Sequence, residues 1–378
     1  MAKSLRDVAR IVEPRDRLDT VVVTFLAPGA KHPIGGAIAI YEFANGMSRR
    51  GHDVQLVHID FIGDTRRRVH QIPDRVETLD DLGWFRFDAA IKHHFPNFFD
   101  ETGLPDADFT SYCDPGVHRI PPTSGLPLIL VQGYEMLPQE FERELYRAPC
   151  PKICVAKWLV NVGRQLGVAD DQLVHVPYGL HHEKYRVTTP VGDRPPQVSM
   201  LYNPHPTKAA NLGLNALAEV KRRIPELRVV VFGGVDSIHS IPEGITYLTS
   251  PAQDVIVNDV YNQSRVFINS STLEGFGLAC VEAMACGCAL VTTANGGSND
   301  YAFHGDTALV SEAEDASALA DHTEYLLLDD EFRPRLALRG EEYVRRFDWD
   351  TSAEKLEAFL QRYQSDPDRY RQPAESSD

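Results

Sequence analysis

The chain has 378 residues, of which 43% are hydrophobic and 24% are charged, a composition typical of folded globular proteins and not of disordered ones. This length is too great for one hydrophobic core of ordinary size, so we expect two domains. The formal net charge of −16 argues against a nucleic-acid partner bound through its phosphates.

Short apolar runs alternate with helical patterns through the first half of the chain. Continuous apolar strands separated by helices are typical of parallel sheets that are covered on both faces. Strands are expected at residues 20–28, 52–60, 87–93, 126–133, 150–156 and 172–179, and helices at 37–51 and 157–167.

The stretch 187–197 is rich in Pro, Thr and Gly and is the best candidate for a linker. The alternating pattern then restarts. Strands are expected at 197–202, 227–234, 265–271 and 289–294, and helices at 208–225, at 254–263, from near Phe276 onward, and in the tail that runs to about Tyr370.

These patterns predict an α/β fold with two Rossmann-like domains, whose parallel sheets face each other across a cleft at their carboxyl ends. We assign residues 1–188 to an N-terminal domain and residues 196–350 to a C-terminal domain. Residues 351–378 are predicted to form a C-terminal helix, which could pack back on the N-terminal domain, and a frayed tail.

The sequence also bears on where the protein works. No apolar run approaches the about 18 residues of a membrane span, and the first residues lack the apolar core of a signal peptide. The six cysteines contain no Cys-x-x-Cys pair, which suits reduced thiols. We therefore expect a cytoplasmic protein, and contact with the inner face of the membrane stays open.

Two carboxylates, Glu274 and Glu282, bracket an apolar segment that contains two glycines, in the stretch LEGFGLACVEAMACG. Buried carboxylates are costly unless they bind something. Gly275 and Gly277 leave backbone N–H groups approachable at the start of a helix, which is a natural anion site. Glu282 lies further along that helix and, as an acceptor-only group, could hold both hydroxyls of a ribose. The alternative is a loop acid followed by a partly exposed helix acid.

This Glu-x7-Glu pattern resembles the retaining, nucleotide-sugar-dependent glycosyltransferases of family four, the glycosyl transferases group 1, which have the GT-B fold. PIGGAIAIYEFANGMSRRGHDV resembles the family's glycine loop and first helix, and VPYGLHHEKY the segment that closes its first domain. NGGSNDYAFHGDTALVS resembles the stretch before its last strand. LILVQGYEMLP is similar to bacterial rhamnosyltransferases of that class. The resemblance covers residues 20 to 360.

The resemblance implies that the second domain holds a nucleotide diphosphate sugar and that the first holds a glycan, a lipid-linked or a small-molecule acceptor. The sugar would be transferred with retention of anomeric configuration and without a metal ion or other cofactor. The implied donor-binding residues are Glu282, Gly275, Phe276, Gly277, Leu278, His205, Gly35 and Gly36. The implied catalytic group comprises Glu274, which would hold sugar hydroxyls, with Lys208, His94 and His93.

Lys208 follows the strand at 197–202, where the family places an Arg and a Lys that neutralise the donor diphosphate. Lys208 matches the Lys, but the Arg is missing, and Asn203 or His205 stands near its place. Diphosphate binding would then depend more on Lys208 and on the backbone amides of the Gly-Phe-Gly segment. The alternative is a solvated lysine at the start of a helix.

Two further pairs are candidates: His93 and His94 end an expected strand, and Gly35 and Gly36 lie between the first strand and its helix. His93 and His94 could hydrogen-bond the donor sugar or the leaving group, although a structural or surface role is as good an interpretation. Gly35 and Gly36 would let the backbone approach a phosphate or sugar, whereas the alternative is a plain strand-to-helix turn. A basic run at 66–68 could meet an anionic acceptor or phospholipid, but a solvated loop is the simpler interpretation.

Other functions are left open or set aside. Three Asp-x-Asp tripeptides do not follow an apolar strand as a metal site of the other large glycosyltransferase fold requires, and no His-Glu-x-x-His helix is present. The remaining alternatives are a sugar-nucleotide epimerase or phosphorylase on the same fold, or a catalytically idle protein that binds nucleotide sugars.

Overall fold

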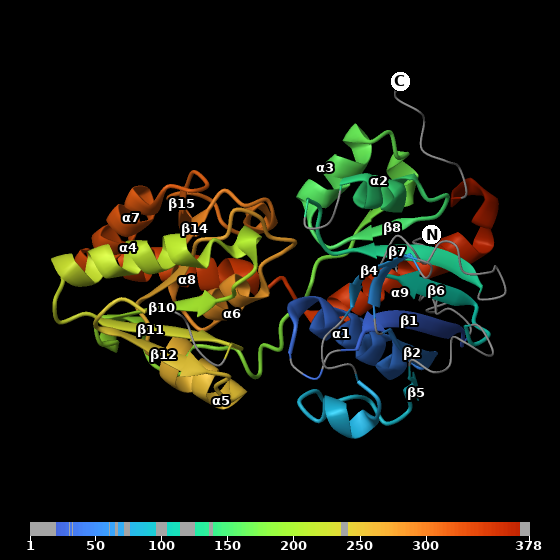
Figure 1. Ribbon diagram of the computed structural model, residues 1–378, viewed down its shortest axis with the longest axis horizontal. Helices are drawn as coiled ribbons and strands as arrows, with labels where there is room; N and C mark the ends of the chain where they lie inside the picture. Colours follow the sequence, from blue (N-terminus) through green and yellow to red (C-terminus); the bar gives the residue numbers. More distant parts are fainter. Residues whose placement is uncertain are drawn as a thin grey trace, which may run out of the picture.

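The computed structural model describes residues 20–29, 31, 33–59, 61–64, 67–71, 76–95, 104–113, 125–135, 139–235 and 241–370. In this part of the chain, two α/β halves lie side by side (Figure 1). Each half is built on a parallel sheet, one of seven strands and one of six. The predicted class, two α/β domains with parallel sheets, is confirmed.

The first half contains the sheet that is formed by the N-terminal part of the chain. Its strands, in order across the sheet, are β5 (Lys92–His94), β2 (Asp53–Ile59), β1 (Val22–Pro28), β6 (Phe109–Tyr112), β7 (Leu126–Val131), β8 (Lys152–Cys154) and β9 (Leu173–His175). The same half contains the helices α1 (Gly35–Arg49), α2 (Gln139–Arg147) and α3 (Lys157–Gln165), the 3-10 turns η1 (Leu79–Leu82) and η5 (Asp170–Gln172), and an antiparallel pair of β3 (Phe61–Asp64) with β4 (Arg67–Gln71).

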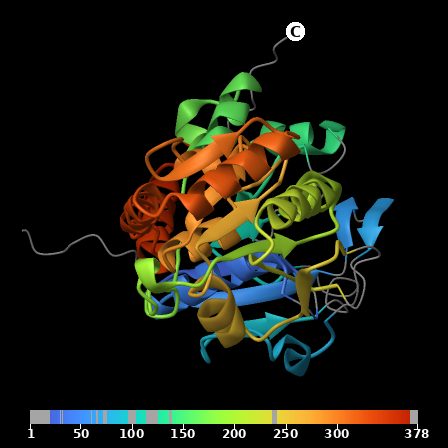
Figure 2. The ribbon, with the colours of Figure 1, turned by 90° about the vertical axis from the view of Figure 1, so that its left-hand side faces the viewer.

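The second half repeats this plan, with helices on both faces of its sheet (Figure 2). Its strands, in order across the sheet, are β12 (Ile245–Thr249), β11 (Arg228–Gly233), β10 (Gln197–Tyr202), β13 (Val266–Asn269), β14 (Ala289–Thr293) and β15 (Ala308–Ser311). Its helices are α4 (Ala210–Arg223), α5 (Gln253–Val255) with the π-helical turn η8 (Ile256–Tyr261), α6 (Leu278–Ala285), α7 (Ala316–Leu328) and α8 (Phe332–Val344), and its 3-10 turns are η6 (Val191–Asp193), η7 (Pro206–Lys208) and η9 (Gly297–Asp300).

Some elements differ from the sequence-based prediction. The strand expected at 87–93 is reduced to β5, because Asp88 starts a turn in which its carbonyl accepts from the N–H of Ile91 and its carboxylate from that of Ala90. The short strands β6 and β12 and the helix α2 had no distinct pattern. β6 carries Thr110 and Ser111, which are both buried although they are polar, so its sequence does not look like a core strand.

The chain returns to the first half at its C-terminal end. Helix α9 (Trp349–Ser365) packs against α1, and a Cβ on Gly46 of α1 would lie 2.6 Å from the Cβ of Ala353. The hydroxyl of Tyr363 donates to the carbonyl of Pro127 at 3.0 Å. In Figure 1 this helix runs along the first half and not along the second. No helix among the described residues has both the length and the apolar character that crossing a membrane requires.

The predicted linker 187–197 is attached to the second half. The guanidinium of Arg194, which is 1% exposed, donates to the carbonyls of Ser264 and Cys286. The N–H of Thr188 donates to the side chain of Asn262 at 2.7 Å. The chain therefore passes between the halves outside this linker. It does so near Leu180 and again near Asp348, and these two residues lie side by side.

Candidate active site

An ion pair joins two of the predicted site residues at the carboxyl end of the second sheet. Lys208 Nζ lies 2.7 Å from Glu274 Oε2, and Ser271 Oγ donates to Glu274 Oε1 at 2.7 Å. Both charged side chains are largely buried, with exposed fractions of 24% for Lys208 and 13% for Glu274. The loops that carry them follow β10 and β13, which are neighbours in the sheet. A partly buried ammonium group is therefore held in place by a carboxylate.

The loop at 273–277 leads directly into helix α6. The N–H of Glu274 donates to the carbonyl of Asn295 at 2.9 Å, and Gly277 caps the helix with φ +90° and without a side-chain hydrogen bond. A Cβ on Gly277 would collide with the hydroxyl of Tyr301, so only glycine fits here. Because the first N–H groups of a helix have no partners within it, the start of α6 is suited to an anion. Leu278 is its first residue.

Phe276 was predicted to bind the donor with its neighbours, and its side chain lies away from solvent. Its ring is 1% exposed and packs against Tyr178 and Phe347, at centroid distances of 5.4 and 5.3 Å. Tyr178 belongs to the first half, so this ring lies in an aromatic contact between the halves. Phe276 could therefore contact a ligand only through its backbone.

Glu282 lies in α6 beside two tyrosines. The hydroxyl of Tyr261 donates to Glu282 Oε2 at 3.1 Å, and the hydroxyl of Tyr185 also bonds to this carboxyl group. Burial raises the pKa of Glu282, while the two hydroxyls and the nearby ammonium of Lys184 lower it by less. A carboxylate has about four lone-pair sites, so two hydroxyl donors leave room for others.

In the first half, Gln132 lies next to two of the predicted glycines, Gly36 and Gly275. The backbone carbonyl of Gln132 packs against Gly275 so closely that a Cβ there would overlap it, and its Oε1 would lie 3.3 Å from a Cβ on Gly36. The hydroxyl of Tyr178 donates to the same Oε1 at 2.5 Å. A Cβ on Gly35 would meet no other atom within 4 Å. The carboxyl ends of the two sheets therefore meet at Gln132.

Neither Gln132 nor Tyr178 was singled out from the sequence. The available signal for Gln132 was its position directly after the apolar strand β7, where parallel sheets place functional side chains. For Tyr178 there was no signal of comparable strength.

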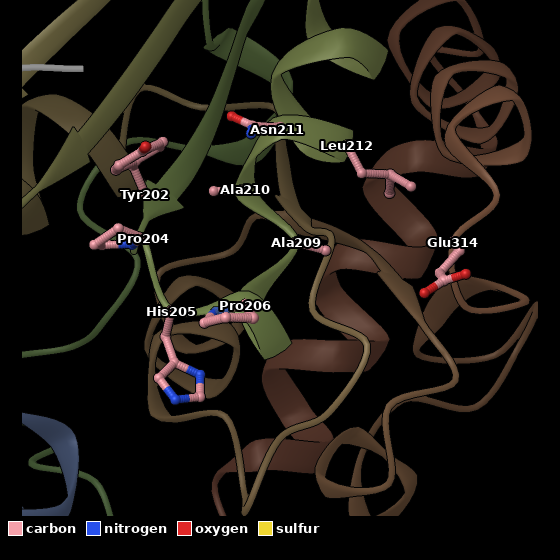
Figure 3. A pocket seen from close by; sticks show the side chains of 9 residues that line it. All are labelled: Tyr202, Pro204, His205, Pro206, Ala209, Ala210, Asn211, Leu212 and Glu314. Atoms are coloured by element: carbon pink, nitrogen blue, oxygen red, sulfur yellow. The ribbon is translucent and has the colours of Figure 1, made fainter. Parts of the chain in front are cut away.

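A pocket of about 360 Å³ lies beside the loop that carries Lys208. Figure 3 shows His205 at one rim of this pocket and Glu314 at the opposite rim. His205 is exposed, with its Nδ1 2.8 Å from the hydroxyl of Thr207, and its N–H donates to Asn203 Oδ1 at 2.9 Å. Asn203 therefore shapes the loop by a side-chain contact with its backbone.

His93 and His94 lie on the edge strand β5, away from the ion pair. His93 Nδ1 is 3.0 Å from His58 Nε2, and His94 Nε2 is 2.9 Å from Gln55 Oε1. With neighbouring strands about 4.8 Å apart, β5 lies four spacings, or about 19 Å, from β7. Burial and neighbouring histidines lower the pKa of His58 to about 3 and that of His93 to about 4. The histidine pair thus belongs to a neutral cluster at the sheet edge, and its catalytic role stays a prediction.

Two other expectations concern charge. Of the basic run at 66–68, residue 66 and the side chains of the other two lie outside the described residues. Within the described ranges, no group of three or more His, Cys, Asp or Glu side chains is placed to hold a metal ion.

Comparison with known proteins finds a family match in the second half of the chain. The model of the family "Glycosyl transferases group 1" matches residues 182–343, which include Lys208, Glu274 and Glu282. This part of the chain is similar to that family. Among group 1 relatives, D-inositol 3-phosphate glycosyltransferase of Corynebacterium aurimucosum is 30% identical over 164 residues, which cover 40% of this chain and 39% of the relative.

A second relative matches a similar share of the chain at a similar identity. The GDP-mannose-dependent alpha-(1-6)-phosphatidylinositol monomannoside mannosyltransferase of Mycobacterium tuberculosis is 26% identical over 194 residues, which cover 47% of this chain and 49% of the relative. The match thus spans less than half the length of these curated relatives.

Solved structures extend the likeness to both halves. Sucrose-phosphate synthase from Thermosynechococcus elongatus aligns with a TM-score of 0.68 at 15% identity, over 91% of this chain and 99% of that one. HepE from Anabaena, in complex with UDP-glucose, aligns with a TM-score of 0.70 at 14% identity, over 90% and 99%. These alignments show that the described part of the chain has the GT-B fold.

Proposed function

We propose that this protein is a glycosyltransferase that moves a sugar from a nucleotide diphosphate sugar to an acceptor. The observation that carries the proposal is the Lys208–Glu274 pair at the start of α6, within the part that the group 1 family model matches. A cation beside a helix N-terminus is suited to a diphosphate. The relatives whose names state a glycosyltransferase activity support it.

Catalysis would come from stabilising the leaving group. As the bond between sugar and diphosphate breaks, negative charge grows on the diphosphate oxygens, and groups fixed around them lower the barrier. Lys208 would exchange Glu274 for the diphosphate. Glu274 would then be available to the sugar hydroxyls while Ser271 still donates to it. Glu282 would hold the ribose, next to the hydroxyls of Tyr185 and Tyr261.

The first half would supply the acceptor site, and it meets the donor loop at Gln132. The acceptor would present a hydroxyl group on a glycan, a lipid-linked sugar or a small molecule. A phosphatidylinositol mannoside in the name of one relative supports a lipid-linked acceptor and work at the inner face of the membrane. Retention of anomeric configuration, absence of a metal requirement and a likeness to rhamnosyltransferases rest on the sequence resemblance.

A thermal-shift panel of UDP, GDP, dTDP and ADP tests this proposal first. One nucleotide should raise the melting temperature, because a ligand that binds only the folded state stabilises it. The matching nucleotide sugars are then incubated with the protein without acceptor. Slow release of the nucleoside diphosphate indicates a transferase, whereas binding without release indicates an idle protein. A requirement for inorganic phosphate would indicate a phosphorylase, and conversion of the sugar without transfer would indicate an epimerase.

A further inference from the structure

Trp158, the second residue of α3 in the first half, contacts the loop that carries the ion pair. Its indole Nε1 donates to the carbonyl of Gly275 at 3.0 Å. Its ring lies against Gly296, where an added Cβ would be 3.0 Å from the ring carbon Cδ2. Gly296 has φ +81°, which a larger residue would adopt only with strain. The backbone at this position is thus shaped to receive the indole.

The two contacts of Trp158 fall on adjacent pieces of one structure. Glu274 and Gly296 form a parallel backbone bridge, and the N–H of Glu274 donates to the carbonyl of Asn295 at 2.9 Å. Trp158 therefore contacts both segments of this bridge, one at Gly275 and the other at Gly296. Any shift of the indole would be passed to the backbone that carries Glu274.

The hydrogen bond to Gly275 also determines where the next N–H points. In a trans peptide the C=O of one residue and the N–H of the next lie in one plane and point in opposite directions. Because the carbonyl of Gly275 points to Trp158, the N–H of Phe276 points away from the indole. The orientation of an amide in the predicted anion site is thus set by a side chain of the other half.

A carboxylate fixes α3 in this place. Asp300 of the second half is 3% exposed, and its Oδ2 accepts from the N–H of Lys157 at 3.2 Å and lies 3.1 Å from Nε2 of His175. Lys157 is the first residue of α3, so Asp300 acts as a cap for this helix from across the domain boundary. The indole is held on an element that is itself fastened to the second half.

We propose that Trp158 is a positioning residue, which holds the Glu274–Gly277 loop and its amides in the arrangement needed for catalysis only when the two halves are docked. This inference rests on the proposed function, because it assigns the loop to the diphosphate of the donor. It makes the leaving-group site incomplete in an open molecule. A nucleotide sugar bound to the second half alone would then be protected from wasteful hydrolysis.

The variant Trp158→Phe tests this inference, because it keeps an aromatic ring and removes the indole N–H. Trp84→Phe is the matched control, since Trp84 lies in the first half and its Nε1 has no hydrogen-bond partner among the described residues. For Trp158→Phe we expect kcat for donor cleavage to fall about ten- to a hundredfold with the donor KM changed less than threefold. Trp84→Phe should match the wild type in both constants.

Hydrogen–deuterium exchange provides a readout that does not need activity. Amides in peptides covering 273–281 and 295–300 should exchange several-fold faster in Trp158→Phe than in the wild type and in Trp84→Phe. Asp300→Asn should speed exchange in the same peptides, since it weakens the fastening of α3. Unchanged exchange in Trp158→Phe would overturn the positioning role. If the wild-type protein cleaves no nucleotide sugar, only the proposed function falls, and the exchange measurement still decides the role of Trp158.

Discussion

Lys208 is already paired with Glu274 at 2.7 Å, so a diphosphate must compete with a carboxylate for its ammonium group. The negative charge on the diphosphate is greater in the transition state than in the bound donor. Lys208→Ala should therefore lower kcat by roughly two decades or more and should weaken donor binding much less. Steady-state kinetics on the correct donor and acceptor measure both effects. The exposed Lys355→Ala on α9 is the control, and near-normal turnover in Lys208→Ala would mean that the diphosphate lies elsewhere.

The variant Glu282→Gln should weaken nucleotide binding but raise the stability of the fold at neutral pH. Glu282→Gln removes charge-assisted hydrogen bonds and should weaken nucleotide binding by about 1–3 kcal/mol. The pKa of Glu282 is raised by burial above its ordinary value of 4.5. The ionised group therefore costs stability at neutral pH, and this cost disappears as the pH falls through the raised pKa toward 4.5. The variant should thus melt at a higher temperature than the wild type at pH near 7, and at a similar temperature in acid.

Calorimetric titration with the nucleotide and melting curves at two pH values measure both effects of Glu282→Gln. The exposed Glu354→Gln serves as the control for each. Unchanged nucleotide affinity in a folded variant would show that Glu282 does not bind the ribose. A melting temperature lowered equally at both pH values would contradict the cost of the buried charge.

The strand pattern predicts where some candidate residues lie in the sheets and leaves the place of others undetermined, for physical reasons. Lys208 and Glu274 follow predicted strands, which places both at the carboxyl edge of the second sheet. Because those strands are neighbours, the two side chains form an ion pair. His93 lies in a strand as predicted, but the order of strands across the sheet puts that strand at the outer edge. Trp158 acts through a contact between domains, which no local pattern reveals.

At the scale of single elements, the left-handed cap of α6 controls the anion site. Gly277→Ala forces an alanine to φ +90° and drives its Cβ into the hydroxyl of Tyr301. We expect a loss of about 1–3 kcal/mol in stability and a weaker response to nucleotide in thermal shift. Gly192→Ala is the matched control, because a Cβ there meets no other atom within 4 Å. Equal melting temperatures for the two variants would show that the cap is not strained.

The hydrophobic pattern predicts some of the single strands and helices and misses others. Strands such as β7 and β11 contain continuous apolar runs, and their existence and type follow from that. The edge strand β12 is short and has no buried residue, so its pairing with β11 decides its structure. The helix α6 begins two residues later than predicted, because the glycine at 277 adopts a conformation that the helix cannot continue.

At the scale of the whole molecule, the hinge should lie at the crossings and not in the predicted linker. Arg194 fixes the linker to the second half, while Leu180 and Asp348 pass side by side between the halves. Closure on the donor by rotation about these segments should lower the radius of gyration measured by small-angle scattering when nucleotide sugar is added. An identical radius with and without the ligand would argue for a rigid pair of domains.

The central claim is that this chain cleaves a nucleotide sugar at the site formed by Lys208, Glu274 and the start of α6. The most direct test is the release of nucleoside diphosphate, followed by chromatography, when the wild type and Lys208→Ala are incubated with the sugars of whichever nucleotide stabilises the fold. We expect steady release by the wild type with at least one donor, and release at least about a hundredfold slower with Lys208→Ala. No release by a folded wild-type protein that binds the nucleotide, or equal release by both proteins, would contradict it.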